Sequence, residues 1–216
     1  MRYIAALIIL ISSFTLLHAQ ESVWDSWDKQ VVIRSNTAAD NEYLNEEEKK
    51  VVLFMNLARA DGALFAETFL TEYIELNGIE KNSFVRSLYQ DLKKTDYLKP
   101  FIPENDLISV AQGHATESGK TGHTGHKDFK KRFEPFMGNP YQHVGENCSY
   151  GYNEAIDIVI SLLIDDGVKD LGHRKNILSD SFNSVGVAIR PHKSFRSNCV
   201  IDFGKQSRSD LNEVPF

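Results

Sequence analysis

The spacing of apolar residues predicts a chain made mainly of helices, with two strands near its C-terminal end. In several stretches apolar positions recur every three to four residues, which is typical of amphipathic helices. In the first stretch, Asn45 followed by Glu48 has the pattern of an N-terminal capping box. Gly119 is expected to end the fourth stretch. Helices are therefore predicted over residues 45–59, 64–76, 84–97, 106–118 and 154–164.

The last of these helices and the stretch that follows it indicate a layered fold. Residues 154–164 are apolar on nearly all sides, which predicts burial between a sheet and neighbouring helices. Residues 184–189 and 199–203 are mostly apolar and β-branched, so we expect two strands joined by a polar loop. An antiparallel pair is the natural arrangement, and it places Cys199 in a central or near-central strand.

The first nineteen residues have the pattern of a secretory signal peptide. A single basic residue, Arg2, precedes an apolar run over residues 4–17, and the small residue Ala19 stands at the junction. A membrane anchor is the alternative, but a bilayer span needs about 20 apolar residues, and this run is interrupted by Ser12 and Ser13. We therefore expect a secreted or periplasmic mature protein with no membrane span after cleavage at Ala19.

Beyond the signal peptide we expect one domain. Residues 20–44 are polar and aperiodic and are interpreted as an N-terminal arm, residues 45–204 as the domain, and residues 205–216 as a loose tail. The formal net charge of the whole chain is −6. An acidic chain without a basic stripe argues against nucleic acid as a partner, because nucleic acid selects clustered Lys and Arg.

Polar chemistry gathers in three segments that flank the predicted buried helix. The first is a glycine-rich loop over residues 119–133 that contains His123 and His126, and glycine lets such a loop place a side chain closely. The others are Gly-Glu-Asn at 145–147 and Gly-His-Arg at 172–174. His114, on the preceding helix, is interpreted as structural. No nucleophile elbow or nucleotide-binding fingerprint accompanies these residues.

In their order and wording these motifs resemble the CAP superfamily of SCP-like extracellular proteins, in its bacterial type. The resemblance covers residues 45–204. It includes NLAR at 56–59, GEN at 145–147, GHRKNIL at 172–178, SVGVA at 184–188 and VIDFG at 200–204. It implies an α+β fold: a three-layer α-β-α sandwich with a central antiparallel sheet and an open cleft. In some members of the superfamily, two histidines and two acidic residues of this cleft bind zinc or another divalent ion.

The resemblance also implies particular site residues. His126, with His123 as the alternative, matches the first family histidine, Glu146 matches the glutamate of Gly-Glu-Asn, and His173 matches the second histidine. These three form the expected metal site. The fourth family position is Leu162 here, so Asp165 or Asp166 would have to supply the second carboxylate. The expected cleft residues are His126, Glu146, Asn147, Asp166, His173 and Arg174, with Glu146 and His173 as catalytic candidates.

The two cysteines of the chain, Cys148 and Cys199, both lie in the part expected to be exported, where a disulfide can persist. One bridge is the only intramolecular pairing that two cysteines allow. We therefore predict a Cys148–Cys199 disulfide, with two buried free thiols as the alternative.

For function, the sequence favours a non-enzymatic extracellular binding module whose His/Glu-lined cleft holds a lipid, a glycan or another component of the cell envelope. The alternative is a hydrolase of peptide or envelope material that depends on zinc or another divalent cation. A purely structural surface protein is the third hypothesis. All three place the chain outside the cytoplasm.

Overall fold

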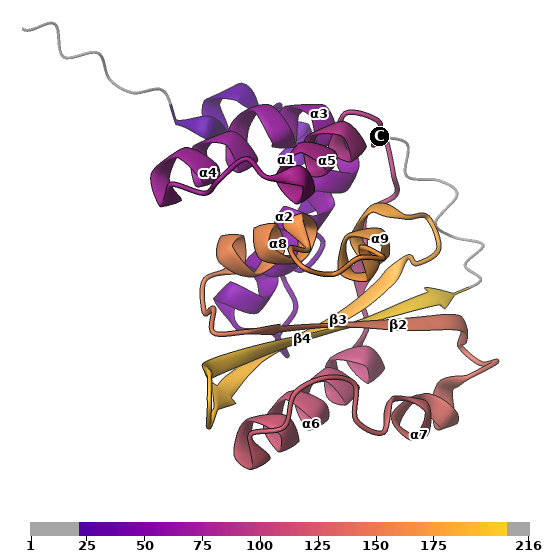
Figure 1. The fold of residues 1–216 in the computed structure, drawn as a ribbon. Coiled ribbons are helices and arrows are strands. Elements are labelled where there is room, and N and C mark those ends of the chain that lie inside the picture. The colour runs from indigo at the N-terminus through magenta and orange to yellow at the C-terminus, as the bar shows by residue number, and fades with distance from the viewer. Residues whose placement is uncertain (1–21, 207–216) are drawn as a thin grey trace, which may run out of the picture.

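The computed structural model describes residues 22–206, which form a sheet with helices on both of its faces (Figure 1). The helices of the N-terminal half lie on one face together with the two that follow the second strand, and the remaining helices lie on the other face. In chain order the elements are η1 (Val23–Ser26), α1 (Lys29–Ser35), α2 (Glu46–Ala60), α3 (Gly62–Phe65), the π-helical turn η2 (Ala66–Leu70), α4 (Thr71–Asn77), α5 (Ser83–Leu92), β1 (Ile102–Pro103), α6 (Asn105–Thr121), α7 (Phe129–Phe133), η3 (Glu134–Phe136), β2 (Tyr141–Tyr150), α8 (Ala155–Ile164), α9 (Gly172–Leu178), β3 (Ser184–His192) and β4 (Arg196–Gln206).

The sheet has the order β1-β3-β4-β2. Strands β3 and β4 form the predicted antiparallel hairpin, and β2 pairs antiparallel with the other edge of β4. The central position of β4 confirms the expected place of Cys199. The two-residue strand β1 is an addition that the apolar pattern did not predict, and it pairs parallel with β3. The architecture confirms the predicted α+β three-layer sandwich.

Helix α2 begins as its sequence predicts. Asn45 and Glu48 exchange backbone hydrogen bonds in a capping box, with Asn45 Oδ1 accepting at 2.9 Å and Glu48 Oε2 accepting at 2.8 Å. Helix α8 starts differently, because Glu154 makes no side-chain cap bond. Instead the backbone N–H of Ala155 donates to Glu47 Oε2 at 2.9 Å, so a carboxylate from α2 caps α8. The two helices then pack together in the main core.

On the opposite face, α6 lies directly against β3. At Gly186 of β3 a Cβ atom would lie 2.1 Å from the carbonyl carbon of Leu107, so only glycine allows this approach. At Gly119 a Cβ atom would lie 2.2 Å from the carbonyl oxygen of Pro191. Gly119 therefore serves packing, and the prediction that it ends the helix is wrong. Helix α6 continues to Thr121 and is closed by Gly122, whose φ is +78°.

The segment interpreted as an N-terminal arm contains two short helices, η1 and α1, followed by turns over residues 36–44. Helix α1 packs on α2, and Trp27 is 5% exposed in the main core with its Nε1 donating to Thr68 Oγ1 at 3.2 Å. The predicted signal peptide at 1–19 and most of the predicted tail lie outside the described residues. Within residues 22–206, no helix is long and apolar enough to cross a membrane.

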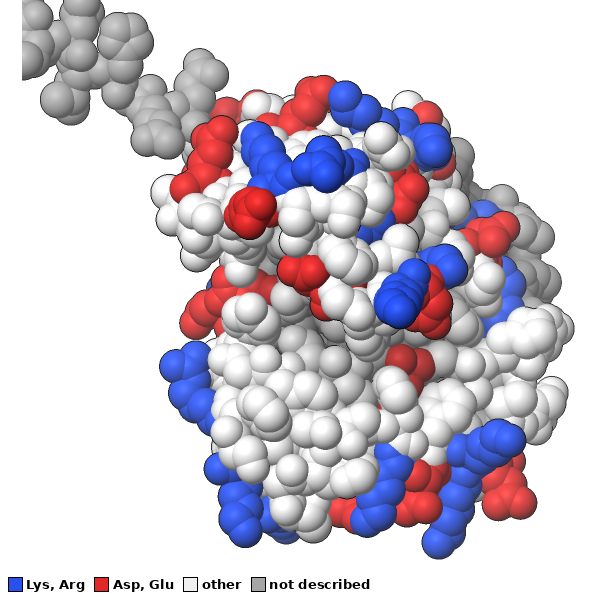
Figure 2. Space-filling model, in the orientation of Figure 1, with Lys and Arg blue, Asp and Glu red and all other residues white. Residues whose placement is uncertain are grey.

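The face of the molecule drawn in Figure 2 carries acidic and basic side chains in mixture, and uncharged side chains cover much of its lower half. No broad patch of one sign is present on this face.

Candidate functional site

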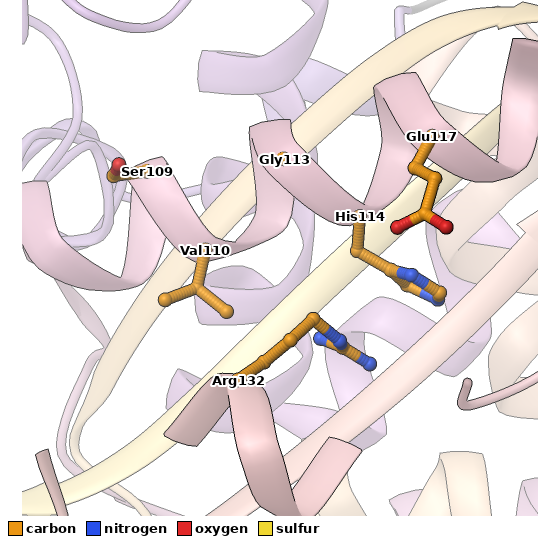
Figure 3. A pocket seen from close by; sticks show the side chains of 6 residues that line it. All are labelled: Ser109, Val110, Gly113, His114, Glu117 and Arg132. Carbon is orange, nitrogen blue, oxygen red and sulfur yellow. The ribbon is translucent and has the colours of Figure 1, made fainter. Parts of the chain in front are cut away.

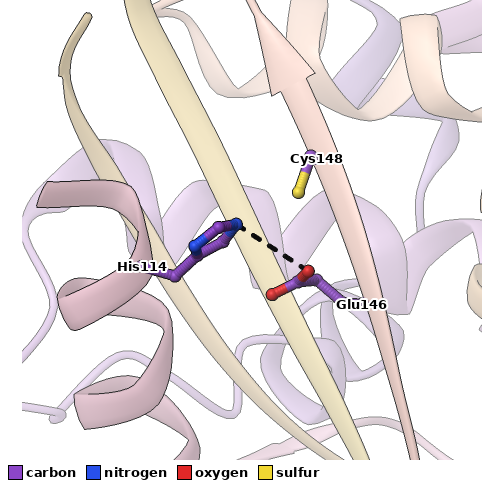
Figure 4. Close-up of side chains that lie close together, drawn as sticks. All are labelled: His114, Glu146 and Cys148. Carbon is purple, nitrogen blue, oxygen red and sulfur yellow. Dashed lines mark ion pairs between the residues drawn. The ribbon is translucent and has the colours of Figure 1, made fainter. Parts of the chain in front are cut away.

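Glu146 lies at the centre of a polar cluster on the α6 side of the sheet. Its side chain is 1% exposed and lies near His114 of α6 (Figure 4). Arg132 of α7 holds both carboxylate oxygens, with Nη1 to Oε2 at 2.6 Å and Nη2 to Oε1 at 3.0 Å. His126 lies against the same carboxylate, with 2.8 Å between Nδ1 and Oε1. This is a two-pronged Arg–carboxylate pair reinforced by an imidazole.

The backbone of the loop before α7 explains how His126 reaches the sheet. Gly125 has a φ of +85°, in the left-handed region that favours glycine. Its carbonyl oxygen lies 2.9 Å from His114 Nε2, and its N–H donates to the Tyr150 hydroxyl at 2.8 Å. With Gly125 fixed to α6 and β2, the next side chain is directed at Glu146. Of the two alternatives from the sequence, His126 is therefore the histidine at Glu146; His123 instead accepts a hydrogen bond at its backbone oxygen from the ring of His192.

Charge in this cluster is set by burial and by the Arg132 contact. Burial opposes ionisation of Glu146, but hydrogen bonds from His126 and Arg132 outweigh it and lower the pKa of the carboxyl to about 2. Burial also opposes the charge on Arg132, yet the bond to Glu146 raises the pKa of the guanidinium. Glu146 is therefore ionised at any physiological pH, and both of its oxygens are occupied.

His114 and Cys148 complete the buried side of the cluster (Figure 4). His114 is 3% exposed, and its Nε2 lies 3.9 Å from Glu146 Oε1. Burial lowers the pKa of His114, which favours the neutral imidazole. The Cys148 thiol projects from β2 on the same side, and burial together with the charge of Glu146 raises its pKa well above the ordinary value. Cys148 is thus a protonated thiol in this arrangement, which does not suit it for a nucleophile.

Asp202 of β4 lies directly opposite Glu146 in the strand register. Cross-strand partners share a face of the sheet, so the two carboxyl groups are neighbours. Asp202 is 0% exposed, and neither of its side-chain oxygens accepts a hydrogen bond, but in its protonated form it can donate one to Glu146. Burial, followed by the charge of Glu146, raises the pKa of Asp202 well above its ordinary value. The neutral carboxyl group of Asp202 is therefore the cross-strand neighbour of the ionised carboxylate of Glu146.

Two cavities border this cluster. One of about 300 Å³ is lined by His126, Phe129 and Glu146. The other, of about 380 Å³, lies between α6 and α7 and is lined by Ser109, Val110, Gly113, His114, Glu117 and Arg132 (Figure 3). Arg132 points from α7 toward His114 in that view. Arg132 thus lines one cavity, and its ion-pair partner Glu146 lines the other.

The second histidine predicted for the site lies on the other face of the sheet. His173 is the second residue of α9, and its Nδ1 lies 2.6 Å from Asp165 Oδ1. The backbone nitrogens of His173 and Arg174 donate to Asp165 Oδ2 at 2.9 and 3.2 Å. Asn147, which follows Glu146 on β2 and points to the opposite face, donates to the His173 carbonyl oxygen at 3.0 Å. Asp165, and not Asp166, is therefore the carboxylate that holds this histidine.

The predicted metal site does not assemble in this arrangement. Among residues 22–206, the potential ligands whose atoms lie within 4.8 Å of one another in a group of three or more are His114, Glu146 and Cys148. His173 does not join them, because the sheet separates it from Glu146. The set His126, Glu146 and His173 therefore does not fit a single ion, and no step of a mechanism is derived through one.

Three other predicted cleft residues have structural positions. Arg174 is 2% exposed and donates to the carbonyl oxygens of Leu163, Ile164 and Phe84, to Ser87 Oγ and to Asp91 Oδ2. Asn147 is 0% exposed and joins β2 to α9. Asp166 is exposed and accepts from Asn82 Nδ2 at 3.1 Å. Placing Arg174 and Asn147 in an open cleft is therefore corrected: both side chains connect elements inside the protein.

The predicted disulfide is wrong, because both cysteines are free. The strand register gives the reason. Cys148 pairs with Val200, and Ser149 pairs with Cys199, so the two cysteines point to opposite faces of the sheet. Cys148 packs with the residues of α6, and Cys199 packs in the main core. A bridge between them would require a shift of the strand register.

Four residues of the two clusters were not selected from the sequence, or were given another role. Arg132 stands in a Lys-Lys-Arg run that reads as a solvated face, and Asp202 stands in an apolar strand. His114 was interpreted as structural and Asp165 as one of two alternatives. The one available signal was Asp202, an acidic residue inside a predicted buried strand, because burying a carboxyl group without a partner is energetically costly.

The chain thus combines a mixed sheet, helices on both of its faces and one histidine–carboxylate pair on each side. The sequence profile of the cysteine-rich secretory protein family, the CAP family, matches residues 86–203, and the chain belongs to that family. No curated protein sequence matches the chain significantly.

Three solved structures from bacteria are similar to this chain. An outer surface protein from Borrelia burgdorferi is 17% identical, with a TM-score of 0.44, over 60% of this chain and 97% of its own. An extracellular protein containing an SCP domain from Bacillus anthracis is 16% identical, with a TM-score of 0.44, over 71% of this chain and 39% of its own. A cysteine-rich secretory protein from Staphylococcus aureus is 20% identical, with a TM-score of 0.38, over 59% and 41% of the two chains.

Proposed function

We propose that this chain is an exported, non-enzymatic binding protein, and that the cavity at His126 and Phe129 takes a hydroxylated ring of a cell-envelope glycan. The observation that carries the proposal is the state of Glu146. Both of its oxygens are held by Arg132 and His126, and its pKa is about 2. A carboxylate in this state is a poor general base and cannot be a general acid near neutral pH.

The other groups needed for hydrolysis are also missing from the cavity. His126 and His173 lie on opposite faces of the sheet, so they cannot act as an acid and base pair on one substrate. Cys148 is buried and protonated. Recognition is the chemistry that remains, because a cavity with an aromatic wall and a few fixed polar groups suits a bound ligand.

The groups that line the cavity favour a sugar over an acyl chain. The His126 side chain is 49% exposed and is held at Nδ1, which leaves Nε2 on the far side of the ring for a ligand hydroxyl. Phe129 offers an apolar surface beside it. A sugar ring presents both C–H and O–H groups and matches this pair. Export is supported by the predicted signal peptide at residues 1–19.

The proposal is tested by calorimetric titration of the protein that begins at Gln20 with soluble peptidoglycan disaccharides and chito-oligosaccharides. We expect saturable binding that weakens at least about tenfold in His126→Ala and Phe129→Ala, corresponding to roughly 1.4 kcal/mol each. His173→Ala is the matched control, because it removes an imidazole held by a carboxylate on the other face, and it should bind as the unaltered protein does.

Chromatography of the same mixtures separates binding from turnover. Glycan cleavage that Glu146→Gln abolishes would replace the proposal with the hydrolase alternative. Absence of binding to every glycan tested, or binding only to anionic lipid vesicles, would overturn it as well.

A further inference from the structure

Another cavity lies on the face of the sheet opposite Glu146, where α2 and α8 pack side by side (Figure 1). Its lining residues come from η1, α2 and the start of α8. Its volume is about 370 Å³, and small-molecule sites occupy about 300 to 1,000 Å³. The cavity is therefore large enough for a small ligand and is separate from the cavity at His126.

An exposed indole ring forms part of the wall of this cavity. Trp24 is 40% exposed, although its ring packs against Phe69 and Phe54 with centroids 4.8 and 6.0 Å apart. Leu53 and Ile156 add apolar surface to the lining. The face of an indole ring attracts a cation more strongly than the other aromatic side chains do. The two ring contacts hold such a face at the cavity.

The charged groups of the cavity leave a net negative charge. Glu47, Glu154 and Lys50 line it, two carboxylates against one ammonium group. Both oxygens of Glu47 are occupied, by Lys50 Nζ at 2.6 Å and by the backbone N–H of Ala155 at 2.9 Å. Glu154 makes no side-chain cap bond to α8. Its carboxylate is therefore the one that can serve a ligand.

The same contacts disfavour an anionic ligand. The start of a helix ordinarily attracts anions through its free N–H groups. At α8 the carboxylate of Glu47 already takes this place. Burial opposes ionisation of Glu47, but hydrogen bonds from Lys50 and from the Ala155 backbone outweigh it and lower the pKa of the carboxyl. An anion would therefore meet a carboxylate that stays ionised.

We propose that this cavity binds a small organic cation, whose ammonium group pairs with Glu154 and contacts the ring of Trp24. The apolar part of the cation packs on Leu53 and Ile156. A carboxylate and an indole face are both partners of an ammonium group, and the apolar lining selects an organic cation over a metal ion. This site does not depend on the glycan proposed for the other face.

Lys50 is the competing cation at this site. Its side chain is 53% exposed. The hydrogen bond to Glu47 raises the pKa of Lys50, and the charge of Glu154 contributes. Lys50→Met keeps the aliphatic chain and removes the positive charge. It should therefore strengthen the binding of a cation about 3- to 10-fold, whereas loss of a merely structural residue would not raise affinity.

The test is a calorimetric titration of the untagged protein that begins at Gln20 with three ligands of similar size. These are the phenethylammonium ion, neutral 2-phenylethanol and anionic 3-phenylpropionate. We expect the ammonium ion to bind with a Kd below about 1 mM, the alcohol to bind at least about tenfold more weakly, and the anion not to bind. Of the two tryptophans in the chain, Trp27 is buried. A fluorescence change on binding that is lost in Trp24→Leu therefore locates the ligand.

Matched variants test the role of the carboxylate. Glu154→Gln should weaken binding of the ammonium ion at least about tenfold and leave binding of the alcohol unchanged. Glu46→Gln is the control, because Glu46 is 81% exposed and is not among the residues that line the cavity. Its effect should be less than about twofold, since exposed charges are screened.

The proposal is overturned if the three ligands bind alike, if none binds at about 1 mM, or if the two glutamate variants have equal effects. His126→Ala changes the cavity on the other face and should leave binding of the ammonium ion unaltered. The ammonium and glycan titrations therefore succeed or fail independently of each other.

Discussion

The two histidine–carboxylate pairs of this protein look alike in distance and differ in everything that surrounds them. His126 lies 2.8 Å from Glu146, and His173 lies 2.6 Å from Asp165. Glu146 is neutralised by the guanidinium of Arg132 and borders a cavity. Asp165 is satisfied by backbone N–H groups at the start of α9. The same pair of residue types thus borders a cavity on one face of the sheet and holds the start of a helix on the other.

The difference shows that proximity of an imidazole to a carboxylate does not define a site. The two pairs differ in whether the polar groups around them still have unused hydrogen-bonding capacity. Asp165 uses its oxygens on α9, while Arg174 of that helix connects α5, α8 and α9. In the other cluster Cys148 makes only long contacts, of 3.8 and 3.9 Å, and the fully buried Asp202 accepts no hydrogen bond. Unsatisfied buried groups, and not the pair itself, indicate function.

The largest difference in stability between the two faces is expected from substitution of Arg132 and Arg174. Arg174→Met should lower the free energy of unfolding by about 3 to 5 kcal/mol, because it leaves several buried oxygens without a donor. Arg132→Met should cost less, about 1 to 2 kcal/mol, because Arg132 is 15% exposed and His126 can still pair with Glu146. Urea unfolding of both variants measures the two values. Equal losses would contradict the division into a structural and a functional face.

A second prediction concerns acid stability on the Glu146 side. The folded-state pKa of about 2 lies below the ordinary value of 4.5. The ionised carboxylate therefore stabilises the fold above pH 4.5, and this contribution, on the order of 3 kcal/mol, is lost as the pH falls toward 2. Urea midpoints measured from pH 6 down to pH 2.5 should show the loss.

The matched control for the acid effect is Glu146→Gln, which cannot ionise. We expect it to be less stable at pH 6 and to show a smaller decrease between pH 4.5 and 2.5. If its pH profile had the same slope as that of the unaltered protein, the acid sensitivity would have to come from other carboxylates.

The smallest expected effect has the opposite sign. The pKa of Asp202 is raised by burial and by Glu146, so the neutral form stabilises the fold at low pH, and this contribution is lost as the pH rises through the raised value. Asp202→Asn cannot ionise and should raise stability at pH 7 by about 1 kcal/mol, or roughly 2 to 4 °C in Tm, in metal-free protein. A decrease measured by calorimetry would show that Asp202 is paired.

The helices and the fold class could be predicted because their signals are local or repeated. Asn45 and Glu48 lie three residues apart and make the bonds that the pattern indicates. The start of α8 could not be predicted in this way, since its cap comes from Glu47, far away in the chain. Strand β2 was missed because its apolar residues do not alternate; its inward positions on the α6 side are Glu146 and Cys148.

The site was only partly predictable for a related reason. The sequence motifs identified Glu146 and His126 as site residues. The face of the sheet on which a side chain lies depends on strand register, which the motifs do not give. Glu146 and Asn147 are adjacent on β2 and therefore point to opposite faces. That single step places Asn147, and with it His173 and Arg174 of α9, on the other side of the sheet. The disulfide prediction failed for the same reason, as Cys148 and Cys199 belong to diagonal positions of neighbouring strands.

The order of strands also has a consequence for how the protein matures. β4 is the last described element of the chain, yet it occupies the middle of the sheet, and among the described strands it is the only partner of β2. The environment of Glu146 therefore cannot form until β4, with Asp202, has been synthesised. A chain threaded through a membrane from its N-terminus would carry β2 across without a partner, and the cluster would be completed only after residue 206 had followed. Completion of the site is therefore a late step in the folding of the chain.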